Sequence, residues 1–287
     1  MLRGTITALV TPFTERGEVD FEGFERLLKR QLAAGVDGLL VLGTTGEAPA
    51  LSDEERVEVL KFVRERAEGR ATLIAGTGTN NTAKTVKYTA EAVELGYRYA
   101  LVVTPYYNKP TQEGLYRHYS TVAKEVPDAE IIVYNVPGRT GVKILPETVE
   151  RLVKEHSNVV AVKEASGSVD AATALIVRGI DVLSGDDSLT VPMISVGVQG
   201  VISVLSNVLP GDTKRMVDAA LKGDFEAARR VHLKLWGLMK ALFAETNPGP
   251  VKAALEITGV CGRWVRPPLA EVKPETYSRL KELLEAL

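Results

Sequence analysis

Residues 159–166 read VVAVKEAS and place a lysine at the end of a short apolar run. The strand-forming residues around Lys163 predict a buried strand. Burying an unpaired ammonium costs several kcal/mol unless the amine loses its proton. Burial therefore favours the neutral amine, a nucleophile that can form a Schiff base with a carbonyl. The other interpretation is a lysine at a strand end, with a packed stem and a solvated ammonium.

The composition is that of an ordinary globular protein and excludes several classes. The chain has 287 residues, 45% hydrophobic and 25% charged, with a net charge of −2. A nearly neutral chain lacks the strong excess of basic residues that is typical of nucleic-acid-binding proteins. No apolar run approaches the roughly 18 residues of a membrane span, and the short run at 6–10 does not predict a signal peptide. Cys261 is the only cysteine, which excludes an intrachain disulfide and predicts a packed thiol in a reducing cytoplasm.

Short apolar runs alternate with amphipathic segments along most of the chain. Strands are predicted at 5–10, 39–42, 72–75, 100–104, 131–134, 159–162, 182–183 and 201–204. Helices are predicted at 21–34, 53–67, 83–95, 112–125, from Pro146 onward and at 169–178. Asp20 is placed to cap the first helix, and Ser52 with Glu55 forms a capping box before the second.

About eight strand–helix units in series predict an α/β fold, a TIM (β/α)8 barrel, over residues 1–223. An open doubly wound sheet is the rival, but no GxGxxG or Walker A motif follows the first strand. After Pro210 the strands stop. We expect a C-terminal helical extension over residues 224–287. Helices are predicted at 212–221, at 225–243 and in a last segment that ends at 287, with a Pro-rich passage around Pro248 and Pro250.

Polar clusters follow nearly every predicted strand, where a barrel places its active site. They read GTTGE at 43–47, GTGTN at 76–80, TPYYN at 104–108, YNVPGRT at 134–140 and SGDD at 184–187. Turn chemistry or helix capping explains each one taken alone. Separate explanations are less convincing for three residues that occur together. These are the buried Lys163, Tyr134 one strand earlier, and Arg139 after a Pro-Gly turn. His118, His156 and His232 form no metal-ligand spacing, so no metal site is predicted.

Six motifs together resemble the dihydrodipicolinate synthase family, of the pyruvate-dependent class I aldolase superfamily. They are GTTGE at 43–47, TPYYNKPTQEGLY at 104–116, YNVPGRTG at 134–141, VKEASG at 162–167, SGDD at 184–187 and GVISV at 200–204. The likeness runs from Thr5 through ETNPGPVK at 245–252 and covers nearly the whole chain.

The resemblance implies a Schiff-base mechanism on Lys163. Lys163 would capture the keto carbon of pyruvate, with Tyr134 as the positioned hydroxyl for proton transfer. Tyr134 would be linked through Thr45 to Tyr107, which enters from a neighbouring subunit. The expected assembly is a homotetramer, a dimer of dimers in which Tyr107 crosses the tight-dimer interface.

The resemblance also implies the substrate contacts. Thr44 and Thr45 would hold the pyruvate carboxylate, and Gly185 and Ile202 would line the pocket. Arg139 would bind the carboxylate of L-aspartate 4-semialdehyde, because a guanidinium matches a carboxylate bidentately. No metal or organic cofactor is expected. The product would be 4-hydroxy-tetrahydrodipicolinate, in the diaminopimelate route to lysine.

Three other functions are alternatives to this one. An N-acetylneuraminate lyase or a 2-keto-3-deoxy-sugar-acid aldolase would share the lysine and the tyrosine, but its sugar chain offers Arg139 no matching carboxylate. A non-catalytic relative would be expected to have lost Lys163, Tyr134 or Thr45. A metal-dependent or phosphate-handling barrel enzyme lacks clustered ligands in this sequence.

One departure from the family pattern concerns feedback by lysine. Lysine-inhibited members have an acidic residue where this chain has Lys84, and histidines where Asp53 and Arg56 stand. Lys84 would repel the ammonium groups of lysine by an energy of order 1 kcal/mol. The sequence therefore predicts weak or absent lysine feedback, although Asn80 and Tyr106 remain.

Overall fold

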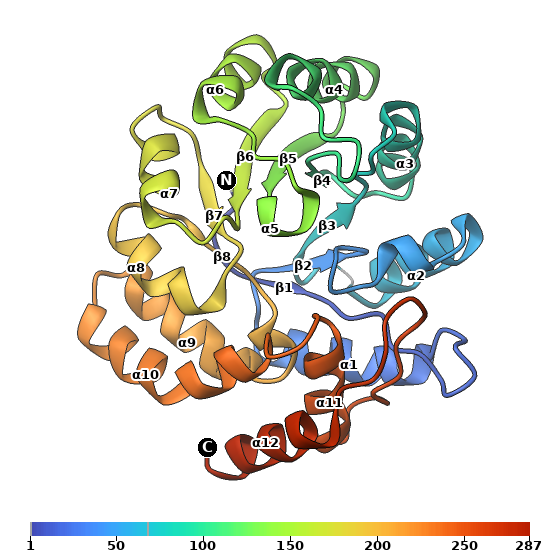
Figure 1. Ribbon diagram of the computed structural model, residues 1–287, viewed down its shortest axis with the longest axis vertical. Helices are drawn as coiled ribbons and strands as arrows, with labels where there is room; N and C mark the ends of the chain where they lie inside the picture. The colour runs from blue at the N-terminus through green and yellow to red at the C-terminus, as the bar shows by residue number, and fades with distance from the viewer. Residues whose placement is uncertain (1, 68) are drawn as a thin grey trace.

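Eight parallel strands close into a barrel in the computed structural model, which describes residues 2–67 and 69–287. The strands are β1 (Gly4–Ala8), β2 (Gly38–Val41), β3 (Thr72–Gly76), β4 (Tyr99–Val103), β5 (Glu130–Asn135), β6 (Val159–Glu164), β7 (Val182–Ser184) and β8 (Gly200–Ser203). Each pairs with the next in sequence, and β8 pairs with β1 to close the sheet. Figure 1 shows this ring at the centre, with helices around it. The predicted TIM barrel is confirmed.

The helices on the outside of the barrel follow the strands in turn. They are α1 (Phe21–Ala33), α2 (Asp53–Ala67), α3 (Thr82–Glu94), α4 (Gln112–Glu125), α6 (Pro146–Glu155), α7 (Val169–Ile176), α8 (Thr190–Ser195) and α9 (Pro210–Leu221). The predicted caps are confirmed, since Asp20 accepts from the Gly23 N–H and Ser52 and Glu55 bond reciprocally. Predicted bounds of strands and helices differ from the observed ones by two residues at most.

Several short helices were not predicted. They are α5 (Pro137–Thr140), α8, α11 (Gly249–Ile257) and the 3-10 helices η1 (Ala48–Ala50), η2 (Asp187–Leu189) and η3 (Leu205–Asn207). Helix α11 lies inside the Pro-rich passage. Its prolines fall at the first turn, where a missing N–H leaves no helical hydrogen bond unmade.

Three helices, α10 (Phe225–Ala241), α11 and α12 (Pro274–Glu285), follow the barrel and lie beside α9 and α1 (Figure 1). Leu235, Val251 and Leu280 of these helices belong to the same buried apolar cluster as Leu9 and Phe24 of the barrel. The extension is thus packed onto the barrel through a shared core. We propose the boundary between residues 223 and 224, where the Asp224 carboxylate caps α10.

The interior of the barrel is filled by one buried apolar cluster that includes Ile74, Leu101 and Ile132. Successive side chains of a strand point to opposite faces. Ala161 of β6 belongs to this interior cluster, whereas Val162 belongs to the cluster between the strands and the helices. Lys163, two residues after Ala161, therefore faces the interior.

Among the described residues, no helix is long and apolar enough to cross a membrane.

Candidate active site

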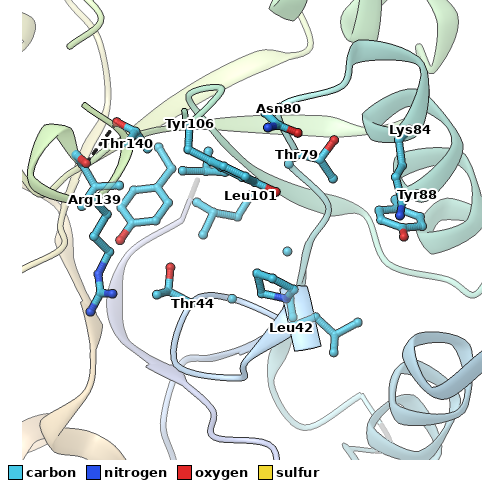
Figure 2. Close-up of a pocket in the computed structure, with 18 of the residues that line it drawn as sticks. Leu42, Thr44, Thr79, Asn80, Lys84, Tyr88, Leu101, Tyr106, Arg139 and Thr140 are labelled. Atoms are coloured by element: carbon cyan, nitrogen blue, oxygen red, sulfur yellow. Dashed lines mark hydrogen bonds between the residues drawn. The ribbon is translucent and has the colours of Figure 1, made fainter. Parts of the chain in front are cut away.

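A cavity of about 390 Å³ opens at the carboxyl ends of β2 to β5. Thr44 and Arg139 line one end, Lys84 and Tyr88 line the other, and Tyr106 lies between them (Figure 2). Tyr134 also lines it, at the end of β5. Three residues of the predicted site, Thr44, Tyr134 and Arg139, therefore share one cavity.

Lys163 does not line this cavity but contacts Tyr134, which does. The parallel register pairs Tyr134 of β5 with Lys163 of β6, and Lys163 Nζ lies 4.2 Å from the centroid of the Tyr134 ring. Lys163 is only 6% exposed, and within residues 2–67 and 69–287 its ammonium forms no ion pair. The buried strand is confirmed, and the interpretation with a solvated ammonium is wrong.

The next residue, Glu164, fixes the end of β6 from the opposite face. Its carboxylate accepts from Asn135 Nδ2 at 2.8 Å and from the Ser166 N–H at 2.6 Å. Asn135 directly follows Tyr134, so this bond ties together the two strand ends that carry Tyr134 and Lys163. No motif or spacing in the sequence predicts that Glu164 and Asn135 form this link.

Gly185, at the end of β7, lies directly against the lysine side chain. A Cβ atom placed there would be 3.1 Å from Lys163 Cε and 2.6 Å from Ala165 Cβ. Glycine is therefore required if Lys163 is to keep its present path. Ile202 of β8 is 1% exposed and belongs to the apolar cluster that fills the barrel interior.

The loop that carries Thr44 and Thr45 is bent into an uncommon backbone shape. Leu42 before it and Glu47 after it both have φ values in the left-handed region, 59° and 52°. Non-glycine residues adopt this region only rarely, and active sites are where such strain collects. Glu47 is held by an ion pair with Lys252 of α11.

Thr44 and Thr45 face different surroundings. Thr44 lines the cavity. Thr45 is 3% exposed, and its Oγ1 accepts a hydrogen bond of 3.0 Å from Asn247 Nδ2. Asn247 and Lys252 lie in the stretch at 245–252 that resembles the family, but no sequence pattern predicts their contacts with this loop.

Arg139 lies on the short helix α5, after the Pro137-Gly138 turn. Its exposed side chain lines the cavity, and its Nη2 donates to the main-chain oxygen of Asn247 at 3.4 Å.

Tyr107, by contrast, lies on the surface and away from the cavity. It is 89% exposed, has a φ of 72°, and does not line the cavity. Thr44, Tyr134 and Arg139 thus line the cavity and Lys163 contacts Tyr134, whereas Tyr107 lies away from the cavity.

The far end of the cavity carries two cations. Arg56 is buried, and its guanidinium lies 4.0 Å from the centroid of the Tyr88 ring, with the Lys84 ammonium 5.1 Å from the same centroid. Asp53, just beyond, accepts hydrogen bonds from Lys87 and from the Tyr88 hydroxyl. The bond from Lys87, followed by the one from Tyr88, lowers the pKa of Asp53 to about 2.

Two further predictions from sequence concern the cysteine and a metal site. Cys261 is buried, and burial raises the pKa of its thiol to about 12, as expected for a packed, inert cysteine. In the part of the chain that the structure describes, no three His, Cys, Asp or Glu side chains gather as metal ligands.

Comparison with known proteins places this geometry in a family. The model of the dihydrodipicolinate synthetase family matches residues 1–287. The chain is 49% identical to a 4-hydroxy-tetrahydrodipicolinate synthase from Hydrogenobaculum sp. (strain Y04AAS1), covering 99% of this chain and 98% of that one.

Two solved structures have nearly the same fold. One is a crystal structure of dihydrodipicolinate synthase from Aquifex aeolicus, with a TM-score of 0.96, 49% identity, and coverage of 99% of this chain and 97% of that chain. The other is described as the first monomeric dihydrodipicolinate synthase variant, with a TM-score of 0.97, 45% identity, and coverage of 99% and 96%.

Proposed function

The chain belongs to the dihydrodipicolinate synthetase family, and from this premise we propose that it joins pyruvate to L-aspartate 4-semialdehyde through a Schiff base on Lys163. The product is 4-hydroxy-tetrahydrodipicolinate. The observation that carries the proposal is the buried Lys163 amine, 4.2 Å from the Tyr134 ring and without a carboxylate partner among the described residues.

The first half of the reaction takes place on Lys163. Its amine attacks the keto carbon of pyruvate, and the carbinolamine loses water to give an imine. Loss of a methyl proton then gives the enamine nucleophile. The Tyr134 ring lies against the Lys163 amine, so we assign the proton transfers to the Tyr134 hydroxyl.

The loop that carries Thr44 and Thr45, called the threonine loop below, holds the carboxylate of pyruvate. Thr44 lines the cavity with Tyr134, so its hydroxyl is available to the substrate and to the proton relay. We retain Thr45 as the relay residue inferred from the resemblance and assign Thr44 as a second candidate. Comparison of Thr44→Val with Thr45→Val in both half-reactions separates the two roles.

The second half of the reaction uses Arg139. Its exposed guanidinium at the cavity binds the carboxylate of aspartate 4-semialdehyde. The enamine attacks the aldehyde carbon, and the substrate's own amine then displaces Lys163 and closes the ring. Gly185 and Ile202 shape the space around the lysine. No step requires a metal or an organic cofactor.

Assembly and localisation belong to the same proposal. A homotetramer built from two tight dimers would give the exposed Tyr107 a neighbouring site to enter. A single buried thiol suits the reducing cytoplasm, where we place the enzyme.

Borohydride reduction in the presence of pyruvate tests the proposal. We expect an adduct that peptide mass spectrometry locates on Lys163, and none in Lys163→Ala. Turnover with aspartate 4-semialdehyde but not with sialic acid would then distinguish the synthase from N-acetylneuraminate lyase. An unmodified Lys163, or an adduct on another lysine, would refute the mechanism.

A further inference from the structure

Asn247 belongs to the C-terminal extension, yet it contacts two residues of the proposed site. Its side chain is 4% exposed, and the residue lies just before α11. Its Nδ2 donates to Thr45 Oγ1 at 3.0 Å, and its main-chain oxygen accepts from Arg139 Nη2 at 3.4 Å. One residue of the extension thus joins the loop after β2 to helix α5.

The hydrogen bond to Thr45 determines which way a proton can point. An asparagine Nδ2 has only donor hydrogens, so Thr45 Oγ1 must be the acceptor in this bond. The single hydroxyl proton of Thr45 is then left for another acceptor. Under the proposed function, that acceptor is the carboxylate of pyruvate or the next hydroxyl of the relay.

The amide oxygen of Asn247, Oδ1, supports a functional role for this residue. Oδ1 is buried and has no hydrogen-bond partner among the residues that the structure describes. A buried acceptor without a partner lowers stability, and such groups are few in native proteins. Packing alone would favour an apolar side chain at this position.

Asn247 is also held firmly. Residues 249–255 of α11 are all buried, and Lys252 of this helix pairs with Glu47, two residues after Thr45. The extension therefore reaches the threonine loop at two points. The ion pair holds the backbone at Glu47, and the amide holds the hydroxyl of Thr45.

We propose that Asn247 is a positioning residue that orients the Thr45 hydroxyl toward pyruvate, which makes the C-terminal extension part of the active site. This inference rests on the proposed function. The side chain acts on the pyruvate half of the reaction. The main-chain oxygen, which any substitution retains, acts on Arg139 and the second substrate.

Asn247→Ala and Asn247→Asp test the inference by single-turnover trapping of the pyruvate imine with borohydride. Asn247→Ala removes the donor, and we expect trapping at least about tenfold slower than wild type. Asn247→Asp has nearly the same shape but offers only acceptors, so Thr45 would donate to it and turn its proton away. We therefore expect a larger loss for Asn247→Asp, with the KM for aspartate 4-semialdehyde within about twofold of wild type.

A double-mutant cycle with Thr45→Val and a neighbouring control complete the test. In the Thr45→Val background, Asn247→Ala should have no further effect, because the shared interaction is already gone. Thr246→Ala, an exposed neighbour, should behave as wild type. Trapping by Asn247→Ala and Asn247→Asp at the wild-type rate overturns the inference, as does an equal rise in both KM values with a lower melting temperature. If wild type itself forms no adduct, the proposed function has failed instead.

Discussion

Lys252 Nζ lies 2.5 Å from Glu47 Oε1, and the two side chains are 0% and 1% exposed. The pair joins helix α11 to the strained end of the threonine loop. Lys252 also donates to the main-chain oxygen of Trp264 at 2.7 Å, and the Arg266 N–H donates to Glu47 Oε2 at 2.9 Å. A buried ion pair is sensitive to the loss of one partner, because the charge that remains is buried and unpaired.

Lys252→Met is expected to lower the free energy of unfolding by about 3–5 kcal/mol, because it leaves the Glu47 carboxylate buried and unpaired. Urea denaturation followed by far-UV circular dichroism measures this loss. The matched control is Lys252→Met combined with Glu47→Gln, which removes both charges and should lose less. A wild-type urea midpoint for Lys252→Met alone would contradict the prediction.

Lys252 also gives stability a dependence on alkaline pH. Burial lowers the pKa of Lys252 to about 8, although the Glu47 charge opposes the shift. In the unfolded chain this pKa is about 10.4, so between these two values the unfolded state binds more protons than the folded state. The contribution of Lys252 to the free energy of unfolding should therefore increase with pH from about 8 to 10.4, and be constant below 8.

Comparison of wild type with Lys252→Met at several pH values isolates this contribution from other groups that titrate in the same range. The difference in unfolding free energy between the two proteins should widen in favour of wild type as the pH rises from 8 to 9.5. Parallel pH profiles would show that Lys252 keeps an ordinary pKa in the folded protein.

Gly185→Ala is expected to impair imine formation rather than folding of the barrel. The added Cβ would lie 3.1 Å from Lys163 Cε and 2.6 Å from Ala165 Cβ, so the lysine must leave its present path. Displacement of a nucleophile by a fraction of an ångström is enough to slow borohydride trapping of pyruvate by at least about tenfold. Gly211→Ala is the control, since a Cβ at that helical glycine meets nothing within 4 Å. Equal trapping rates in the two variants would exclude the steric role of Gly185.

L-lysine is expected to inhibit this enzyme weakly or not at all. Lys84 and Arg56 line the far end of the cavity, and the nearby carboxylate of Asp53 is already bonded to Lys87 and Tyr88. A ligand with two ammonium groups would meet repulsion of order 1 kcal/mol or more there. Initial rates measured against lysine concentration test this, and half-inhibition at sub-millimolar lysine would contradict it.

Reversal of the charge of Lys84, which lines the cavity, should make the enzyme more sensitive to inhibition by L-lysine. Lys84→Glu supplies an acceptor for an ammonium group, and we expect it to lower the lysine concentration needed for inhibition. Lys124→Glu is the matched control, because Lys124 is exposed on α4, away from Asp53, and does not line the cavity. The same response in both variants would show a general charge effect rather than a site.

The barrel could be predicted from sequence because each strand and helix has a local signal. Apolar runs define the strands, and caps such as Asp20 mark where helices begin. The residues that line the cavity, such as Arg139, could be predicted because they directly follow strands. Asn247 could not, since it contacts Thr45 from 202 positions away along the chain. A hydrogen bond between such distant residues leaves no periodicity or spacing that a sequence pattern could reveal.

Tyr107 is a predicted site residue that the single chain leaves exposed and away from the cavity, so its predicted role implies complementation between subunits. It is 89% exposed, with its backbone held in the left-handed region. If it enters a neighbouring site, a Tyr107→Phe subunit paired with a Lys163→Ala subunit rebuilds one complete site. The first subunit supplies the lysine and the second supplies the tyrosine. Random pairing of equal amounts makes about a quarter of all sites complete.

Mixing the two inactive variants under conditions that exchange subunits should therefore restore about a quarter of the wild-type activity per site. Each variant carried alone through the same exchange is the control and should stay at its low activity. Analytical ultracentrifugation of the mixture shows whether the chains associate at all. Associated chains that regain no activity would mean that Tyr107 serves only its own subunit or none. A monomeric wild type with full activity would exclude a shared site altogether, because no partner would then be present to supply the hydroxyl.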